Sequence, residues 1–218
     1  MAAFSAEIAY PNRVAAHCPG TLEHQSVSAD RNPKTGQYVN GVRGVIEWDN
    51  PSNCLDQYGV NHAIALLYDN FGFIEVGTYK KSGMSAPKGY CEQLHPYDLA
   101  KYRFYEFPIL NGLHTSALIF TAEYWHCKWG GDTYQAWTRQ QVGFNSSDGL
   151  VTVHAEGEVR HAQLGEMAPD RLTFTQLNLR WTTGTSWNTM QPTLNAVSSP
   201  YGADKPGGTV IEVWTNAH

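Results

Sequence analysis

The 218-residue chain has no basic run and no apolar stretch long enough to cross a bilayer. Lysine and arginine number 15 against 20 aspartate and glutamate, which gives a formal net charge of -5. Binding to a phosphate backbone requires a basic footprint that this scattered set of cations lacks, so we expect no nucleic-acid partner. A membrane-spanning helix needs about 20 predominantly apolar residues, so we expect no membrane partner either.

The four cysteines show no CxxC pair, so we expect no structural zinc site. They are Cys18, Cys54, Cys91 and Cys127. His126 precedes the last of them, but adjacent strand residues point to opposite faces and do not share a metal. Two interpretations stay open: up to two disulfides in an oxidising compartment, with unranked connectivity, or buried thiols. The first residues lack a signal peptide, and we expect a secreted protein whose leader is not part of this chain, with the cytosol as the alternative.

What the sequence does contain is alternation of β-branched and aromatic residues between turn-forming clusters, with almost no helical periodicity. Without helices to cover a sheet, apolar faces are buried only by closing a barrel or stacking two sheets. We predict an all-β protein in one domain of residues 1–218, a two-sheet antiparallel sandwich of the jelly-roll type. Residues 1–40 are expected to form an irregular arm, and residues 182–209 a long loop before the last strand. The predicted strands are 42–48, 63–68, 73–80, 102–107, 116–128, 134–142, 150–160, 172–181 and 210–214.

Two carboxylates lie within predicted strands, where an isolated charge is costly to bury. Glu75 lies in FIEVGTY, where it shares one face of the predicted strand with Phe73 and Tyr79. Glu156 lies in TVHAEGEVRH, in a polar row opposite an apolar row. Carboxylates in such positions either face water or take part in chemistry. We therefore predict a polar concave face that carries a site.

The order of four segments resembles the glutamic peptidases of the eqolisin type and, more loosely, the neprosin group. The segments are GVRGVIEWDNPS, HAIALLYDNFGFIEVGTYKK, YRFYEFP and AEGEVRHAQLGEMAPDRLTFTQLNL, within roughly residues 38–181. The resemblance implies a two-sheet, concanavalin-like sandwich with the active site on a concave face.

Two positions match the catalytic positions of that family. Glu75 in IEVG stands where eqolisins carry a catalytic glutamine, while neprosin-like enzymes are similar in using two glutamates. Glu156 follows Ala155, as the catalytic glutamate does in the family's Ala-Glu-Trp pattern, with Gly157 in place of the tryptophan. The resemblance thus implies a catalytic pair of Glu75 and Glu156.

The implied activity is that of an acid-active glutamic endopeptidase acting on a peptide or protein, without metal or organic cofactor. Two carboxylates held close do not both ionise readily, so one keeps a proton. Ionised Glu156 would act as general base on a water that attacks the peptide carbonyl, and protonated Glu75 would stabilise the oxyanion. The pair is expected to titrate as a unit and to give an acidic optimum.

Six further residues are candidates for binding substrate, because they share rows with the two acids or mix aromatic and polar character. Trp137 is the best candidate for a platform, and the segment around Glu106 is similar to the family's WYEWYP. The set is Tyr79, Glu106, Trp137, Arg139, His154 and Glu158.

Two other interpretations remain open. Paired carboxylates and tryptophans also suit a carbohydrate-binding or carbohydrate-cleaving jelly roll acting on a glycan. Alternatively the chain is a non-catalytic binding sandwich, in which Glu75 is salt-bridged on a solvated face and Glu156 belongs to a cross-strand charge ladder. The spatial separation of Glu75 and Glu156 distinguishes these interpretations.

Overall fold

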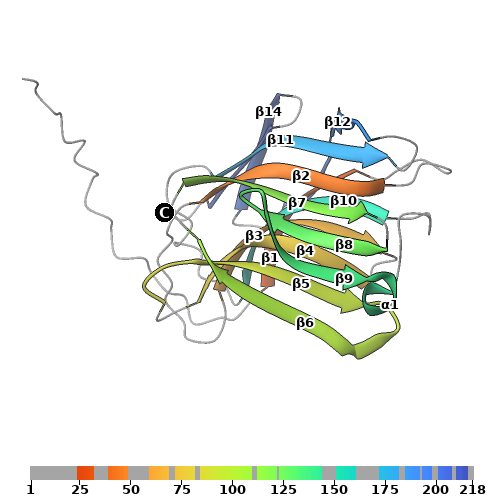
Figure 1. The fold of residues 1–218 in the computed structure, drawn as a ribbon. Helices are drawn as coiled ribbons and strands as arrows, with labels where there is room; N and C mark the ends of the chain where they lie inside the picture. Colours follow the sequence, from red (N-terminus) through yellow and green to blue (C-terminus); the bar gives the residue numbers. More distant parts are fainter. Residues whose placement is uncertain are drawn as a thin grey trace, which may run out of the picture.

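The computed structural model describes a two-sheet antiparallel sandwich (Figure 1). It describes residues 24–31, 39–48, 59–68, 72–81, 84–109, 112–121, 123–143, 151–160, 172–181, 185–191, 193–197, 201–207 and 210–215. The all-β prediction is confirmed. Among these residues, no helix has the length and apolar character needed to cross a membrane.

The first sheet has seven strands in the order β13-β1-β10-β3-β4-β5-β6. The strands are β1 (His24–Arg31), β3 (Gly59–Tyr68), β4 (Gly72–Lys81), β5 (Lys88–His95), β6 (Asp98–Pro108), β10 (Val151–Arg160) and β13 (Thr193–Val197). Strands β3, β4, β5 and β6 follow one another in sequence and in space, as a meander. The strand β10 comes from later in the chain and lies beside β3, which brings the two halves of the sequence together in one sheet.

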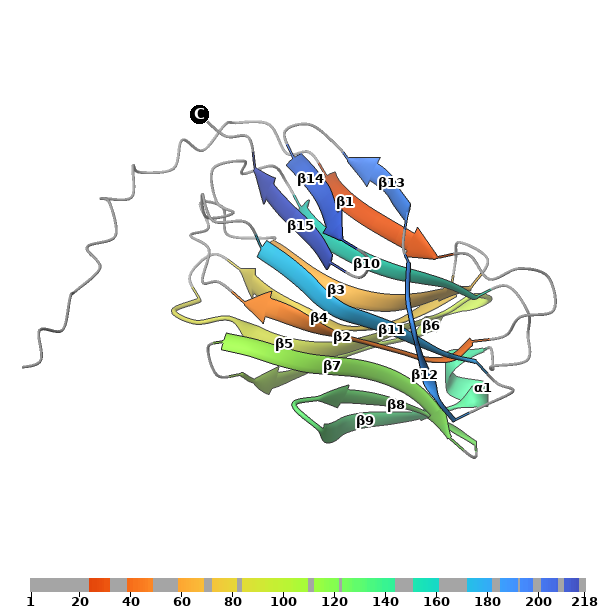
Figure 2. The same ribbon diagram turned by 90° about the horizontal axis from the view of Figure 1, so that it is seen from above.

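The second sheet has eight strands in the order β14-β15-β11-β2-β7-β8-β9, with β12 paired to β11. The strands are β2 (Val39–Trp48), β7 (Gly112–Thr121), β8 (Tyr124–Trp129), β9 (Asp132–Thr138), β11 (Leu172–Trp181), β12 (Trp187–Thr189), β14 (Tyr201–Gly207) and β15 (Val210–Thr215). Figure 2 shows this sheet stacked over the first.

One apolar core fills the space between the sheets. Ile74 and Val76 of β4 are fully buried in it, together with Leu118 of β7 and Trp125 of β8. Because successive strand residues point to opposite faces, the alternate residues of β4 lie on the side turned away from the second sheet. We call this side of the seven-stranded sheet the outer face. Glu75 therefore lies on the outer face while its neighbours anchor the strand in the core.

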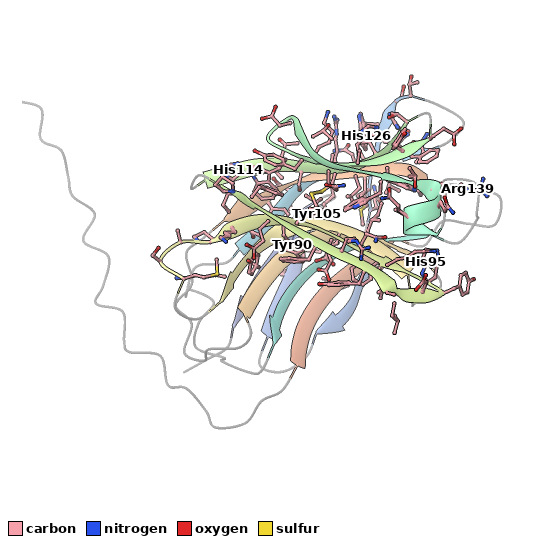
Figure 3. The ribbon with its side chains drawn as sticks, turned by 60° about the horizontal axis from the view of Figure 1, so that its bottom comes forward. Tyr90, His95, Tyr105, His114, His126 and Arg139 are labelled. Carbon is pink, nitrogen blue, oxygen red and sulfur yellow. A yellow bond between two sulfur atoms is a disulfide. The ribbon has the colours of Figure 1, made fainter. Side chains whose placement is uncertain are left out.

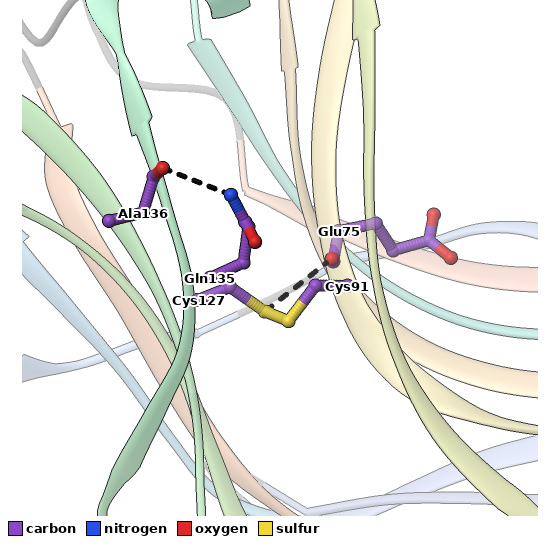
Figure 4. The surroundings of a disulfide bond; sticks show 5 residues. All are labelled: Glu75, Cys91, Cys127, Gln135 and Ala136. Carbon is purple, nitrogen blue, oxygen red and sulfur yellow. Dashed lines mark hydrogen bonds between the residues drawn. A yellow bond between two sulfur atoms is a disulfide. The ribbon is translucent and has the colours of Figure 1, made fainter. Parts of the chain in front are cut away.

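A disulfide crosses the core and ties the sheets together. Cys91 of β5 is bonded to Cys127 of β8, with a Cα–Cα distance of 6.2 Å, and both residues are fully buried. The Cys127 sulfur lies 4.0 Å from the backbone carbonyl oxygen of Glu75 (Figure 4). For this pair, the structure favours the disulfide over buried thiols. The other two cysteines lie outside the described residues.

The predicted strand 134–142 is wrong beyond residue 138. β9 ends at Thr138, and the short helix α1 (Arg139–Val142) follows. The Thr138 side chain accepts a hydrogen bond from the Gln141 backbone N–H, and the Gln141 side chain accepts one from the Thr138 backbone N–H. This reciprocal capping box starts the turn. Gly143, at a φ of 86°, ends it in the left-handed conformation that favours glycine.

Four other expectations are corrected. The region 116–128 is not one strand but the hairpin of β7 and β8, whose connection carries none of the glycine or asparagine that usually marks a turn. The region 1–40 contains β1, and the region 182–209 contains β12, β13 and β14. The strand β5 was also missed, because KGYCEQLH lies in a glycine- and proline-punctuated stretch that suggested a loop.

The cross-sheet disulfide should contribute strongly to stability. A double Cys91→Ala and Cys127→Ala variant opens a loop closed over a sequence separation of 36. Loop-closure entropy alone then lowers the free energy of unfolding by about 4 kcal/mol. Denaturant titration measures this loss, and Val42→Ala, a truncation in the same core, reports the cost of removing a buried side chain alone. A double variant no less stable than Val42→Ala would contradict the assigned role.

Candidate active site

Glu75 is a buried carboxylate on the outer face. Only 6% of its surface is exposed. The hydroxyl of Tyr90, on the adjacent strand β5, donates a hydrogen bond to Glu75 Oε1. Buried polar groups are costly unless they are hydrogen-bonded, and this bond is one of the contacts that compensate for burial. The local sequence explains the position, since the core residues on either side fix the register of the strand.

Glu156 lies on the same face of the same sheet. Across the three strands, Glu156 of β10 is in register with Ala63 of β3, and Ala63 with Gly77 of β4. Glu75 precedes Gly77 by two residues and so shares its face. From the strand spacing and the rise per residue, the Cα atoms of the two glutamates are about 12 Å apart. The backbone thus brings the two positions to one face with a single strand between them.

His154 and Glu158 flank Glu156 on β10, two residues away on either side, and thus occupy the same face. His154 is in register with Ala65, which in turn faces Glu75 across β3 and β4. Glu158 is in register with Asn61. Glu75 and the three predicted positions on β10 therefore form a contiguous set. For β10 the structure describes the course of the strand but not its side chains.

Small residues occupy the sheet between the acidic positions. Ala63 and Ala65 stand on β3, between β4 and β10, and Gly77 follows Glu75 on the outer face of β4. Alanine and glycine rise little above a pleated surface, whereas glutamate and tyrosine rise well above it. The residue types are therefore those of a strip where an extended ligand could lie against the sheet.

An aromatic cluster adjoins Glu75 on the side of β5 and β6. The Tyr79 ring packs edge-on against Tyr90, with centroids 5.7 Å apart, and against Phe104, at 5.4 Å. Tyr90 and Phe104 are stacked at 5.2 Å. Offset and edge-to-face ring pairs fix one another's orientation. The cluster therefore holds the Tyr90 hydroxyl that hydrogen-bonds Glu75.

Glu106 closes this cluster at the edge strand. Its Oε1 accepts a hydrogen bond from the Tyr79 hydroxyl, and its Oε2 forms an ion pair with Lys88 Nζ at 2.7 Å. Glu106 is partly exposed, so the ion pair itself adds little stability. Its geometric effect is to orient Tyr79. Glu106 thus lies beside the predicted site, linked to Glu75 through the aromatic rings.

Two predicted substrate-binding residues lie elsewhere. Trp137 lies on β9, an edge strand of the second sheet, and its side chain is fully buried in the core between the sheets. The prediction of a substrate platform there is wrong. The row of Trp137 faces the core because it is in register with Trp125, another core residue. Arg139 is exposed on α1, and Figure 3 shows it well apart from Tyr90.

His126 and Cys127 are adjacent residues of β8. Cys127 faces the core in the disulfide, and His126 lies on the opposite side of β8. Partial burial lowers the pKa of His126, and the nearby charge of Lys128 lowers it further. The two side chains therefore point to opposite faces of β8.

One acidic residue at the site was missed by the sequence interpretation. Glu92 of β5 is the direct cross-strand partner of Glu75. No strand is predicted for its segment, because glycine and proline punctuate the sequence around it. Alternation in GYCEQ, with Tyr90 and Glu92 on one face and Cys91 on the other, was the available signal.

Comparison with known proteins gives matches at the level of structure. No family model matches the sequence, and no curated protein does either. Scytalido-glutamic peptidase, solved with a peptide-based transition state analog, is 12% identical with a TM-score of 0.58, covering 89% of this chain and 100% of that one. SCP-B, a member of the eqolisin family solved with the tripeptide Ala-Ile-His, is 11% identical with a TM-score of 0.54, over the same shares of each chain.

A β-1,3-glucanase from Mycobacterium marinum is similar as well. It is 11% identical with a TM-score of 0.51, covering 71% of this chain and 72% of that one. At such identities a likeness shows the fold alone. The predicted glutamic peptidase-like fold is confirmed, and the fold is shared with a glycan-acting enzyme.

The Tyr90 hydroxyl should stabilise the folded protein. Tyr90→Phe removes the donor to a buried carboxylate oxygen, which should cost about 1–3 kcal/mol of unfolding free energy. Thermal unfolding would detect this as a lowered Tm. Tyr124→Phe, which removes a hydroxyl from an exposed ring on β8, is the matched control and should change stability by less than about 0.5 kcal/mol. Equal Tm values for the two variants would contradict the assigned bond.

Proposed function

We propose that the protein is an acid-active glutamic endopeptidase in which Glu75 and Glu156 activate a water for peptide-bond hydrolysis. The observation that carries the proposal is the shared face: both positions lie on the outer face of one sheet, separated by a single strand that has Ala63 and Ala65 opposite them. Two glutamate side chains that reach toward each other, with one water between them, can bridge such a gap. The likeness in fold to two glutamic peptidases supports the same interpretation.

In the proposed mechanism Glu156 is the general base. It takes a proton from the water as the water oxygen attacks the peptide carbonyl, and it then gives that proton to the amine nitrogen as the C–N bond breaks. Glu75, in its protonated form, donates a hydrogen bond to the oxyanion that develops. Tyr90 supports this role because its hydroxyl donates to Oε1, which directs the Glu75 proton to Oε2. No metal or organic cofactor takes part in these steps.

The proposed substrate is a peptide or protein in extended form. An extended backbone could lie over the small residues of β3 and the glycine of β4, between the two catalytic positions. His154 and Glu158 are proposed to contact it from β10. Tyr79 and Glu106 are proposed to contact it from the opposite side, where they form one hydrogen-bonded unit.

We propose a secreted location for the protein. The support is the disulfide between Cys91 and Cys127, because such bonds form and persist mainly in oxidising compartments. An acidic extracellular medium would also match the proposed acidic optimum.

A carbohydrate-active function is the second candidate. The observation that favours it is the pair of acidic positions on β10, since Glu156 and Glu158 share one face with a single residue between them. Paired carboxylates on one face also suit glycoside hydrolysis, in which the separation of the carboxyl groups sets the stereochemistry. In this mechanism Glu75 would have no role in bond cleavage.

Substitution of the two glutamates should separate their roles. Glu156→Gln removes the base and should lower kcat by about 10²–10⁴-fold. Glu75→Gln keeps a hydrogen-bond donor and should retain most of the activity, whereas Glu75→Leu should lose about 10²–10³-fold. The assay is cleavage of a denatured protein at acidic pH, with products identified by mass spectrometry and folding checked by circular dichroism.

Two outcomes would contradict the peptidase. Unchanged proteolysis in a folded Glu156→Gln variant would exclude its role as base. Hydrolysis of a β-1,3-glucan without cleavage of any peptide, lost in both Glu156→Gln and Glu158→Gln, would favour the second candidate.

The pH profile provides a separate test of the Glu75 role. Wild-type activity should fall as the pH rises and Glu75 loses its proton, because the ionised carboxylate no longer donates a hydrogen bond. The amide of Glu75→Gln donates at every pH, so this variant should hold its activity to higher pH than the wild type. Measurement of kcat/KM across the acidic and neutral range decides the matter. Superimposable profiles would show that Glu75 is not the donor.

A further inference from the structure

Glu75 has an acidic neighbour that is closer than Glu156. Glu92 is its direct register partner between β4 and β5, so both residues lie on the outer face. Directly opposed residues in an antiparallel pair have Cβ atoms about 4.5–5.5 Å apart. The two carboxyl groups are therefore within reach of each other, in contrast to the longer gap to β10.

Two ionised carboxylates in this arrangement repel each other. Like charges directly opposite are destabilising on a sheet, and the repulsion grows where burial lowers the effective dielectric constant. Glu75 is almost fully buried, while Glu92 is only partly so. Paired carboxyls of this kind share one proton. Burial disfavours the charged form, so the proton belongs on the more buried partner, Glu75.

The groups around the pair are consistent with a shared proton. On β5, Tyr90 donates to Glu75 Oε1. Lys88, two residues before Tyr90 on the same strand, forms an ion pair with Glu106 at 2.7 Å. On β6, the residue opposite Glu92 is the uncharged Phe104.

The strands on the other side of Glu75 complete its surroundings. Its partner on β3 is Ala65, which is uncharged. Beyond β3, the ionisable positions of β10 on this face are His154, in register with Ala65, Glu156, Glu158 and Arg160. Among the groups that flank Glu75 on its own and adjacent strands, Glu92 is thus the carboxylate in direct opposition.

We propose that Glu92 is a positioning residue that keeps Glu75 protonated, and so keeps it a hydrogen-bond donor for the oxyanion, over a wider range of pH. The catalytic consequence rests on the function proposed above, whereas the sharing of a proton does not. The proton is retained by the pair through turnover: Glu75 donates a hydrogen bond without transferring the proton, and Glu92 carries the charge. Glu92 itself touches no reacting atom.

Glu92→Gln tests the catalytic consequence. Without the neighbouring charge, Glu75 loses its proton at lower pH, so the alkaline limb of the kcat/KM profile should move down by about one pH unit. At a fixed pH on that limb, activity should fall about tenfold, through kcat rather than KM. Glu123→Gln, which removes an exposed carboxylate from the turn before β8, is the matched control and should leave the profile in place.

The double variant Glu75→Gln and Glu92→Gln separates positioning from structural support. An amide at position 75 needs no partner to remain a donor, so the double variant should match Glu75→Gln alone in its pH profile. A purely structural role for Glu92 would instead lower activity by the same factor in both backgrounds and at every pH. That result would overturn the proposal.

Carboxyl titration of the wild-type protein gives a readout independent of activity. With glutamate labelled with ¹³C at the side-chain carboxyl, NMR should show the Glu75 and Glu92 resonances titrating in two coupled steps. In Glu92→Gln the Glu75 resonance should lose the step that it shares with Glu92. Independent single-step titrations in the wild type would refute the shared proton. Coupled titration in a protein without peptidase activity would retain the pair and reject only the proposed function.

Discussion

The structure of the site depends on the strict two-residue alternation of β4. Ile74 and Val76 are fully buried between the sheets, and this anchorage leaves Glu75 no choice of face. A register shift of one residue would place the carboxylate in the apolar core and an isoleucine on the outer face. The cost of that exchange fixes the position of Glu75 relative to β3, β5 and β10. Every proposed role of the outer face follows from this register.

The layers behind the outer face reinforce the same arrangement. The disulfide of β5 with β8 lies directly behind Glu75 and holds β5 against the second sheet. In front of it, Tyr79, Tyr90 and Phe104 pack as a unit that ends at the ion pair of Glu106. A carboxylate whose surroundings are this constrained is preorganised, and preorganised polar groups are the main source of electrostatic catalysis. The rigid surroundings thus fit a group that has to donate to a developing oxyanion.

The sequence was sufficient to predict the fold class and the row of residues that each glutamate shares, because strand alternation depends only on backbone geometry. That the rows of Glu75 and Glu156 lie on one face was implied by the resemblance alone. The sequence was insufficient where the signal was tertiary. The row of Trp137 mixes aromatic and polar residues, and only the pairing with Trp125 reveals that it faces the core. The strand β5 is flanked by glycine and proline, which favour a loop, so the sequence does not predict a strand around Glu92. Strand β1, HQSVSADR, has too few apolar residues to mark a buried face.

The central claim is that Glu75 and Glu156 act on a common water. A high-resolution crystal structure at acidic pH measures this most directly, through the positions of both carboxyl groups and the solvent between them. The account predicts one ordered water with an oxygen of each glutamate at hydrogen-bonding distance, about 2.5–3.0 Å. Carboxyl groups that turn away from each other, with no water in contact with both, would contradict it.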